Sequence, residues 1–163
     1  MKSFLFSLAA IAALGLSTQA NAQSLSPVGS ASVTANLDVK QTLSFFIPCN
    51  FTLGASVSSA SAVTTTFASA LVPYTLCTFL FQPISATSDW LITPTSYTSV
   101  TISNVTVDAL DGKCWGSVTG VVTSTSPLRI RIDEQSIDGV DGDNNTVRCF
   151  LKGTATLNGV NLI

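Results

Sequence analysis

The residues of this chain that could do chemistry are few, because its 163 residues include no histidine. This absence removes the Ser-His and Cys-His pairs of hydrolases, imidazole metal ligands and the usual general base near pH 7. Catalysis by carboxylates alone would need two acids in one cleft. Five of the nine acids instead fall within one polar stretch, residues 133–143. We therefore expect a protein that is not an enzyme and that carries no cofactor.

The four cysteines, Cys49, Cys77, Cys114 and Cys149, predict a disulfide framework. An even number of cysteines in an exported chain indicates two disulfides. Spacing alone leaves three pairings open. A weak internal repeat, in which a cysteine, a glycine-bearing strand, a Ser/Thr-rich turn and a second strand precede the next cysteine, favours Cys49–Cys77 and Cys114–Cys149. Zinc is disfavoured because no close C-x-x-C pair exists.

The acidic stretch is a second chemical candidate. Asp138, Asp141 and Asp143 alternate with Gly and Asn, and such oxygen ligands can surround Ca²⁺. The EF-hand pattern fails, because with Asp141 at its first position Thr146 stands where Gly is needed and Lys152 where Glu is needed. We predict a solvated polar loop over residues 133–145 without a metal, and keep calcium as the alternative.

Trp90 and Trp115 could each belong to the core or to the surface. Core packing is the usual place for a large aromatic side chain. The alternation around the second tryptophan separates the two cases: if Cys114 and Val118 point inward, Trp115 points outward. The sequence therefore offers Trp115 as a contact with an apolar surface.

The first 22 residues predict export. Met1 and Lys2 precede an apolar run over residues 4–16, and Ala20 and Ala22 form a cleavage signal. The run is too short for a membrane anchor. We expect a mature chain of residues 23–163, a single domain without a membrane span, exported through the periplasm and secreted or held at the cell surface.

The elements that position these residues are predicted to be strands. Short Val-, Thr- and Ile-rich segments are separated by turn residues at roughly ten-residue spacing. They predict an all-β protein, an antiparallel β-sandwich or flattened barrel of about 8–10 strands with two disulfides. A break in the alternation predicts a bulge near residues 103–104. The candidate strands are 33–45, 50–57, 62–68, 78–84, 91–94, 99–107, 116–123, 128–133 and 147–157.

The first candidate strand, residues 33–45, lies ahead of the first cysteine. It is either the first strand of its own domain or a strand donated to a neighbouring subunit, as in donor-strand complementation. Donation would build a head-to-tail fibre. Every second residue of this strand is apolar except Gln41. The apolar set is Val33, Ala35, Leu37, Val39, Leu43 and Phe45.

Composition limits the partners. Only 10% of the residues are charged and the net charge is −2, against an average usage of about 25% charged residues. With no basic patch, nucleic acid is excluded as a partner. A surface rich in Ser and Thr has little charge repulsion to oppose self-association. The expected partners are further copies of the chain, matrix components and hydrophobic surfaces.

Several ordered motifs resemble one known family. The segments "CNFTLGASVSSA", "SDWLITP", "VTISNVTVDAL", "GKCWGSVTG" and "VRCFLKGTATL" are similar to the PraB-type family, known as alkane oxidation protein activators. The resemblance covers roughly residues 31–157. It implies a small exported bacterial protein linked to biofilm matrix, surface adhesion and growth on hydrophobic nutrients, and it implies no enzyme activity.

The sequence thus predicts a secreted structural or adhesive matrix protein that self-assembles or contacts hydrophobic surfaces. One alternative is a chaperone–usher-like pilin, although the C-terminal "GTATLNGVNLI" lacks the aromatic residue typical of such subunits. The other alternative is a binding module that holds a small apolar ligand, such as an alkane, between its sheets.

Overall fold

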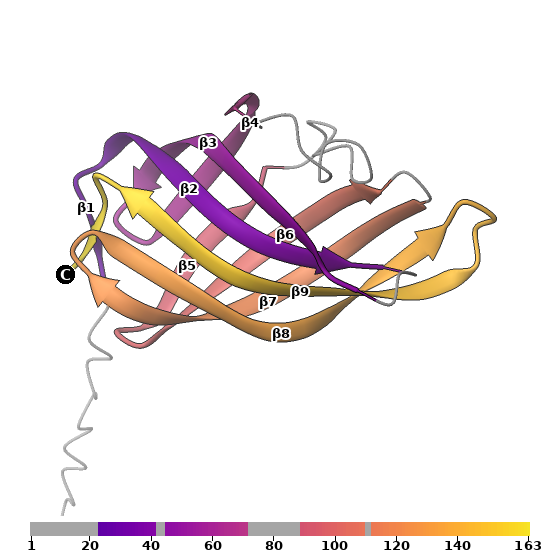
Figure 1. The fold of residues 1–163 in the computed structure, drawn as a ribbon. Coiled ribbons are helices and arrows are strands. Elements are labelled where there is room, and N and C mark those ends of the chain that lie inside the picture. Colours follow the sequence, from indigo (N-terminus) through magenta and orange to yellow (C-terminus); the bar gives the residue numbers. More distant parts are fainter. Residues whose placement is uncertain (1–22, 42–44, 72–88, 110–111) are drawn as a thin grey trace, which may run out of the picture.

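The fold is a single closed β-sheet with a short two-stranded ribbon at one end (Figure 1). The computed structural model describes residues 23–41, 45–71, 89–109 and 112–163. Within these ranges the strands are β1 (Leu25–Ser26), β2 (Gly29–Lys40), β3 (Ile47–Ser59), β4 (Ala62–Leu71), β5 (Leu91–Ser96), β6 (Ser99–Ala109), β7 (Gly112–Thr125), β8 (Leu128–Asp141), β9 (Thr146–Asn158) and β10 (Asn161–Leu162). The predicted strand 78–84 lies outside the described residues.

Strand β2 closes the barrel. Antiparallel pairing runs in sequence order from β2 to β9, and β9 pairs back onto β2. The predicted all-β antiparallel class is confirmed. The predicted sandwich is not observed, because β2 is paired along both edges and leaves no gap at which the sheet could divide into two layers. The long first strand therefore lies between β3 and β9 of its own chain.

The barrel interior is filled by apolar side chains. Alternate residues of each strand point inward, and an eight-stranded barrel has just enough room for them. The inward residues of β2 are Val33, Ala35, Leu37 and Val39, and all four are buried. They pack in one cluster with inward residues of every other barrel strand.

The end of β2 differs from its prediction. The strand stops at Lys40 rather than at residue 45, Leu43 lies outside the described residues, and Phe45 is exposed. Gln41 explains the change, because its side chain occupies the inward parity and is buried. Its Nε2 donates a hydrogen bond of 2.8 Å to the carbonyl oxygen of Val140 in β8. The inward-facing row of β2 therefore changes from apolar to polar at Gln41.

The predicted bulge in β6 is confirmed. Ile102 pairs with Val118 and Val105 pairs with Gly116, so β6 contains one residue more than β7 between these pairs. Asn104 has a left-handed backbone with φ 59°, which Asn tolerates better than most residues. The bulge brings Val105 inward and keeps Asn104 at the surface.

The predicted loop over residues 133–145 is wrong in extent. Strand β8 continues to Asp141, and the turn occupies residues 142–145. A bulge between Ile132 and Gln135 resets the alternation, so Ile137 points inward. The acids that read as a loop are therefore mostly the outward residues of a strand, which sequence polarity alone cannot distinguish from a loop.

The ribbon of β1 and β10 closes one end of the barrel. Leu25 pairs with Leu162, and both side chains are buried with Val160. The backbone joins the ribbon to the barrel, since Leu128 N donates to Val160 O at 2.8 Å. We call this the ribbon end.

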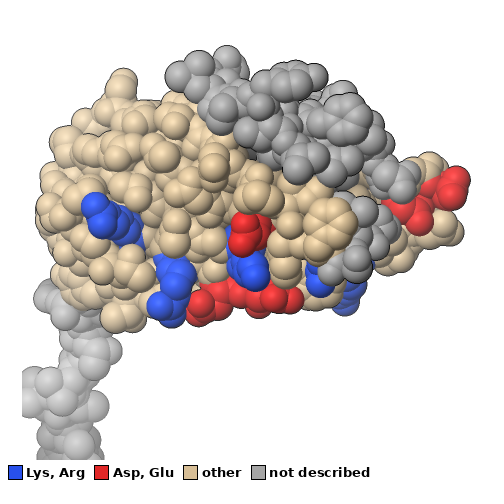
Figure 2. Space-filling view, in the orientation of Figure 1, with Lys and Arg blue, Asp and Glu red and all other residues tan. Residues whose placement is uncertain are grey.

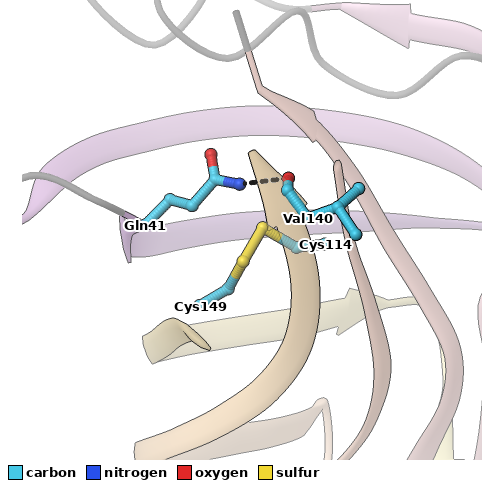
Figure 3. The surroundings of a disulfide bond; sticks show 4 residues. All are labelled: Gln41, Cys114, Val140 and Cys149. Carbon is cyan, nitrogen blue, oxygen red and sulfur yellow. Dashed lines mark hydrogen bonds between the residues drawn. A yellow bond between two sulfur atoms is a disulfide. The ribbon is translucent and has the colours of Figure 1, made fainter. Parts of the chain in front are cut away.

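A disulfide pins the opposite end, which we call the disulfide end (Figure 3). Cys114 of β7 and Cys149 of β9 form a disulfide, and this predicted pairing is confirmed. Their Cα atoms are 6.1 Å apart. Strand β8 lies between them, and in a flat sheet two residues separated by one intervening strand would be about 10 Å apart. The sheet therefore bends sharply here. Cys49 is also disulfide-bonded, and its predicted partner, Cys77, lies outside the described residues.

Gly139 makes this bridge possible. It is the β8 residue opposite Cys114, so the disulfide passes directly over it. A Cβ atom at this position would lie 2.7 Å from the Cys149 Sγ and 2.8 Å from the Lys113 carbonyl oxygen. Only a residue without a side chain fits beneath the bond.

Candidate functional site

The outer face of the barrel is mostly uncharged and polar. On β2 and β9 the outward residues form hydrogen-bonded rows, in which Asn158 Nδ2 donates to Ser32 Oγ at 3.3 Å and to Thr34 Oγ1 at 3.0 Å. Figure 2 shows the charged side chains mainly in a band along the lower flank, where β8 and β9 run in Figure 1. On this largely neutral face the exposed aromatic side chains are Phe45, Tyr97 and Trp115.

Trp115 belongs to a row of outward-pointing residues that crosses four strands. It pairs with Thr106 of β6 on one side and with Asp138 of β8 on the other. Asp138 pairs in turn with Arg148 of β9, and the two form an ion pair of 3.0 Å. The tryptophan is 42% exposed while the neighbouring Cys114 is fully buried, as the alternation predicted.

A hollow of about 370 Å³ opens beside the indole of Trp115. It lies where the bulge interrupts the pairing of β6 with β7. The Thr106 hydroxyl donates a hydrogen bond of 3.2 Å to the Asn104 carbonyl oxygen and so braces the bulge. Among the residues that the structure describes, the hollow is lined by Asn104, Val105, Thr106, Trp115, Gly116 and Ser117.

A second aromatic group lies on the outer face beside β2 and β9. We call it the Lys–Phe cluster, and its members are Lys40, Phe46, Phe150 and Lys152. Lys40 Nζ is 4.9 Å from the centre of the Phe46 ring and 4.6 Å from that of Phe150. Lys152 Nζ is 4.1 Å from the centre of Phe46. Next to these rings in the chain, Phe45 is 59% exposed. Two ammonium groups therefore cover ring faces while one phenyl group stays accessible to other molecules.

The calcium candidates are not brought together as ligands. Asp138 pairs with Arg148. Asp141 Oδ1 accepts the backbone N–H groups of Asp143 and Asn145 at 3.0 and 2.8 Å. In the part of the chain that the structure describes, no three acidic or cysteine side chains form a group that could hold a metal ion.

Asp141 instead organises the turn between β8 and β9. The side-chain amide of Asn145 donates to its Oδ2 at 3.1 Å, and this hydrogen bond, together with the backbone donors, lowers the pKa of Asp141 below its ordinary value of 3.8. The carboxylate is thus used as a structural acceptor.

Trp90 belongs to the core. Its ring meets Phe51 edge to face, with centroids 6.1 Å apart, and its backbone N–H donates to the Thr65 hydroxyl at 3.1 Å. The sequence left this residue open between core and surface, and burial decides for the core.

The sequence interpretation did not find the Lys–Phe cluster. Three of its members are outward residues of β2 and β9, where Lys40 pairs with Phe150, and the fourth, Phe46, directly precedes β3. The parity of each strand could have marked Lys40, Phe150 and Lys152 as outward. Their contact depends on the closure of the barrel, which no local pattern encodes.

The comparisons with known proteins agree with the sequence motifs. The family model of the alkane oxidation protein activator PraA/PraB-like proteins matches residues 1–160. The chain belongs to this family. The predicted resemblance to PraB-type proteins is confirmed. No curated protein and no solved structure gives a significant match to this PraA/PraB-like chain. Among the described residues, no helix has the length and apolar character needed to cross a membrane.

Proposed function

We propose that this PraA/PraB-like protein is an exported structural and adhesive protein of the extracellular matrix or cell surface. One observation carries the proposal: the barrel interior is filled with side chains, while Phe45 and Trp115 remain exposed on a largely uncharged outer face. Buried aromatic area dominates contact energies, so exposed aromatics are the natural contact points. The role proposed is therefore binding through the outside of the barrel, without catalysis.

Assembly by exchange of the first strand is less well supported than contact through the outer face. For β2 to enter a neighbour, its ladders with β3 and with β9 would both have to break. Its inward residues would also leave the core. We therefore propose that self-association, where it occurs, uses folded barrels side by side.

The apolar contact is assigned to Phe45 and the adjacent Lys–Phe cluster. A phenyl ring that is 59% exposed can bury apolar area against a hydrocarbon surface without loss of a hydrogen bond. Beside it, the ammonium groups of Lys40 and Lys152 lie over the rings of Phe46 and Phe150, so the accessible phenyl group is flanked by charge. This combination suits the boundary between water and an oil phase.

Adsorption to hexadecane droplets tests the proposal. We expect Phe45→Ser to lower the amount of protein bound by about fivefold, because the loss of one exposed phenyl contact corresponds to about 1 kcal/mol. Tyr97→Ser is the matched control, since Tyr97 is 48% exposed but lies in the β5–β6 turn near the ribbon end. Equal adsorption of all three proteins would refute an adhesive role for the disulfide end.

A further inference from the structure

We propose that β8 is the contact strand of a dimer in which two copies of this chain lie side by side with their β8 strands antiparallel. This inference rests on the proposed function, in which folded barrels self-associate, and it names the surface that they use. Four exposed charged side chains follow one another along β8: Arg129 and Arg131 come first, and Asp133 and Glu134 follow. We call these four residues the β8 charge row. Strand β8 runs along the charged lower flank of the molecule (Figures 1 and 2).

The two outer charges of the row have no ion-pair partner in the part of the chain that the structure describes. The inner two pair within the strand, since Arg131 Nε lies 3.0 Å from Asp133 Oδ1. Arg129 and Glu134 belong to none of the ion pairs among the described residues. A second copy of the chain carries the same two charges, so it can supply the partner of both at once.

The order of the charges fits a twofold axis. In a symmetric dimer contact, one residue meets a second residue of the other copy, and the reverse contact forms as well. With the axis near Ile132, antiparallel β8 strands place Arg129 of each copy opposite Glu134 of the other, and Arg131 opposite Asp133. Opposite charges then face each other along the whole row, whereas parallel strands would oppose like charges.

The strands beside the row permit a close approach. The residues that pair with the two arginines include short side chains, Thr154 and Thr156 on β9 and Val121 on β7. Val121 is 38% exposed and adds apolar area to the contact. Lys152, opposite the bulge that carries the acids, has its ammonium group 4.1 Å from the centre of the Phe46 ring. The row is therefore accessible to a second barrel.

The contact strand is held in place before it meets a partner. The ladder between β7 and β8 is interrupted from Trp115 to Val121, and the side chain of Gln135 bridges the interruption. Its Oε1 accepts the Thr119 backbone N–H at 2.8 Å, and its Nε2 donates to the Thr119 carbonyl oxygen at 2.6 Å. This amide replaces a backbone hydrogen-bond pair next to the acids. A preordered strand reduces the entropy cost of association.

An antiparallel dimer has its two disulfide ends at opposite extremes. Strand β8 begins at Leu128, which is hydrogen-bonded to the ribbon end, and it ends at Asp141 near the disulfide end. Phe45 of one copy then points away from Phe45 of the other. Such a dimer is bivalent and can bridge two apolar surfaces, which a monomer cannot do.

Sedimentation velocity tests the pairing. We expect reversible dimers in about 0.02 M NaCl and weaker association in about 0.5 M NaCl, because salt screens exposed charges. Arg129→Glu and Glu134→Arg should each weaken the association by about tenfold, since each change makes two contacts of the dimer repulsive. Circular dichroism checks that both variants are folded.

A mixture of the two variants gives the sharpest result. In a mixed dimer, Arg129→Glu and Glu134→Arg face each other with opposite charges at both outer contacts. The equimolar mixture should therefore associate like the parent protein, although each variant alone does not. Asp143→Arg is the matched control, because it makes the same change of charge at an exposed residue of the β8–β9 turn. It should dimerise like the parent protein, and it should restore nothing when mixed with Arg129→Glu.

Two outcomes overturn the inference. One is a parent protein that stays monomeric at low salt up to about 1 mM. The other is a mixture that associates no better than the single variants.

Hexadecane droplets separate this inference from the proposed function. The parent protein should adsorb and cluster the droplets, whereas Arg129→Glu should adsorb equally and cluster them less. If the protein is monomeric but Phe45→Ser still lowers adsorption, the dimer is wrong and the adhesive role stands. If the mixed variants restore the dimer while adsorption is indifferent to Phe45, the apolar contact is wrong and the dimer stands.

Discussion

The two ends of the barrel are closed by different means. At the ribbon end, β1 and β10 bring Leu25, Val160 and Leu162 into the core. At the disulfide end, the buried Gln41 takes an inward position, and a covalent bond from Cys114 to Cys149 crosses beneath it (Figure 3). Apolar burial closes the first end, whereas a cross-link and a buried amide hydrogen bond secure the second.

This difference bears on two of the exposed aromatics, whereas a third, Tyr97, lies near the ribbon end. Burial of apolar side chains at the ribbon end depends on local packing, which a contact with another surface could disturb. The disulfide end is fixed by a bond that does not depend on packing, and it presents both Trp115 and Phe45. A rigid end suits the contact role that we propose for it, because little order is lost when it binds.

The largest expected effect is the loss of the bridge at the disulfide end. Cys114→Ala combined with Cys149→Ala should lower the free energy of unfolding by about 4 kcal/mol, as the chain-entropy model gives for a separation of 35 residues. Urea denaturation monitored by circular dichroism measures this change. The double variant and the parent protein should converge under reducing conditions. A loss below about 1 kcal/mol would show that packing alone holds this end.

A substitution at Gly139 tests how closely the disulfide packs over β8. Gly139→Ala should destabilise the parent protein by about 3 kcal/mol, because its Cβ would overlap the Cys149 Sγ. In the variant without Cys114 and Cys149 the cost should fall, since one of the two close contacts is gone. It should not vanish, because the Lys113 carbonyl oxygen at 2.8 Å remains. Equal costs in both backgrounds would contradict the proposed fit beneath the bond.

The ribbon end should respond to a change in apolar volume. Leu162→Ala should lower the free energy of unfolding by about 2–3 kcal/mol, because the side chain is buried and its removal leaves a cavity. Ile163→Ala is the matched control, because Ile163 is next to Leu162 in the chain but its side chain is exposed. Its removal should change the free energy of unfolding by less than about 0.5 kcal/mol. If both variants unfold at the same urea concentration, the ribbon is not part of the cooperative core.

The smallest effect concerns the turn beyond the disulfide end. The pKa of Asp141 is lowered by the Asn145 side-chain amide and the backbone donors, so its stabilising effect is present above its ordinary value of 3.8. The effect is lost as the pH falls through the lowered pKa. We expect the Asn145 amide signals in NMR spectra to move below pH 3.8 and the rest of the barrel to stay unchanged. Asp141→Asn should remove this transition, and its persistence in that variant would assign it to another group.

Much of the local structure could be predicted from the sequence. Strand positions follow from period-two alternation, which is a local property, and the bulge at Asn104 follows from a break in that alternation. The outward direction of Trp115 follows from its buried neighbour Cys114. The prediction failed for residues 133–141, because an outward row of acids on a strand has the same polarity as a loop.

The amino-acid sequence by itself predicted the all-β class and, through a weak internal repeat, favoured the pairing of Cys114 with Cys149. It predicted that Trp115 points outward on the condition that Cys114 points inward. Tertiary structure alone decided between sandwich and barrel, because closure depends on β9 meeting β2 more than a hundred residues away along the chain. It also decided that Lys40 meets Phe150 and that a hollow opens beside Trp115. These contacts depend on the register between strands distant in sequence, and no short-range pattern fixes that register.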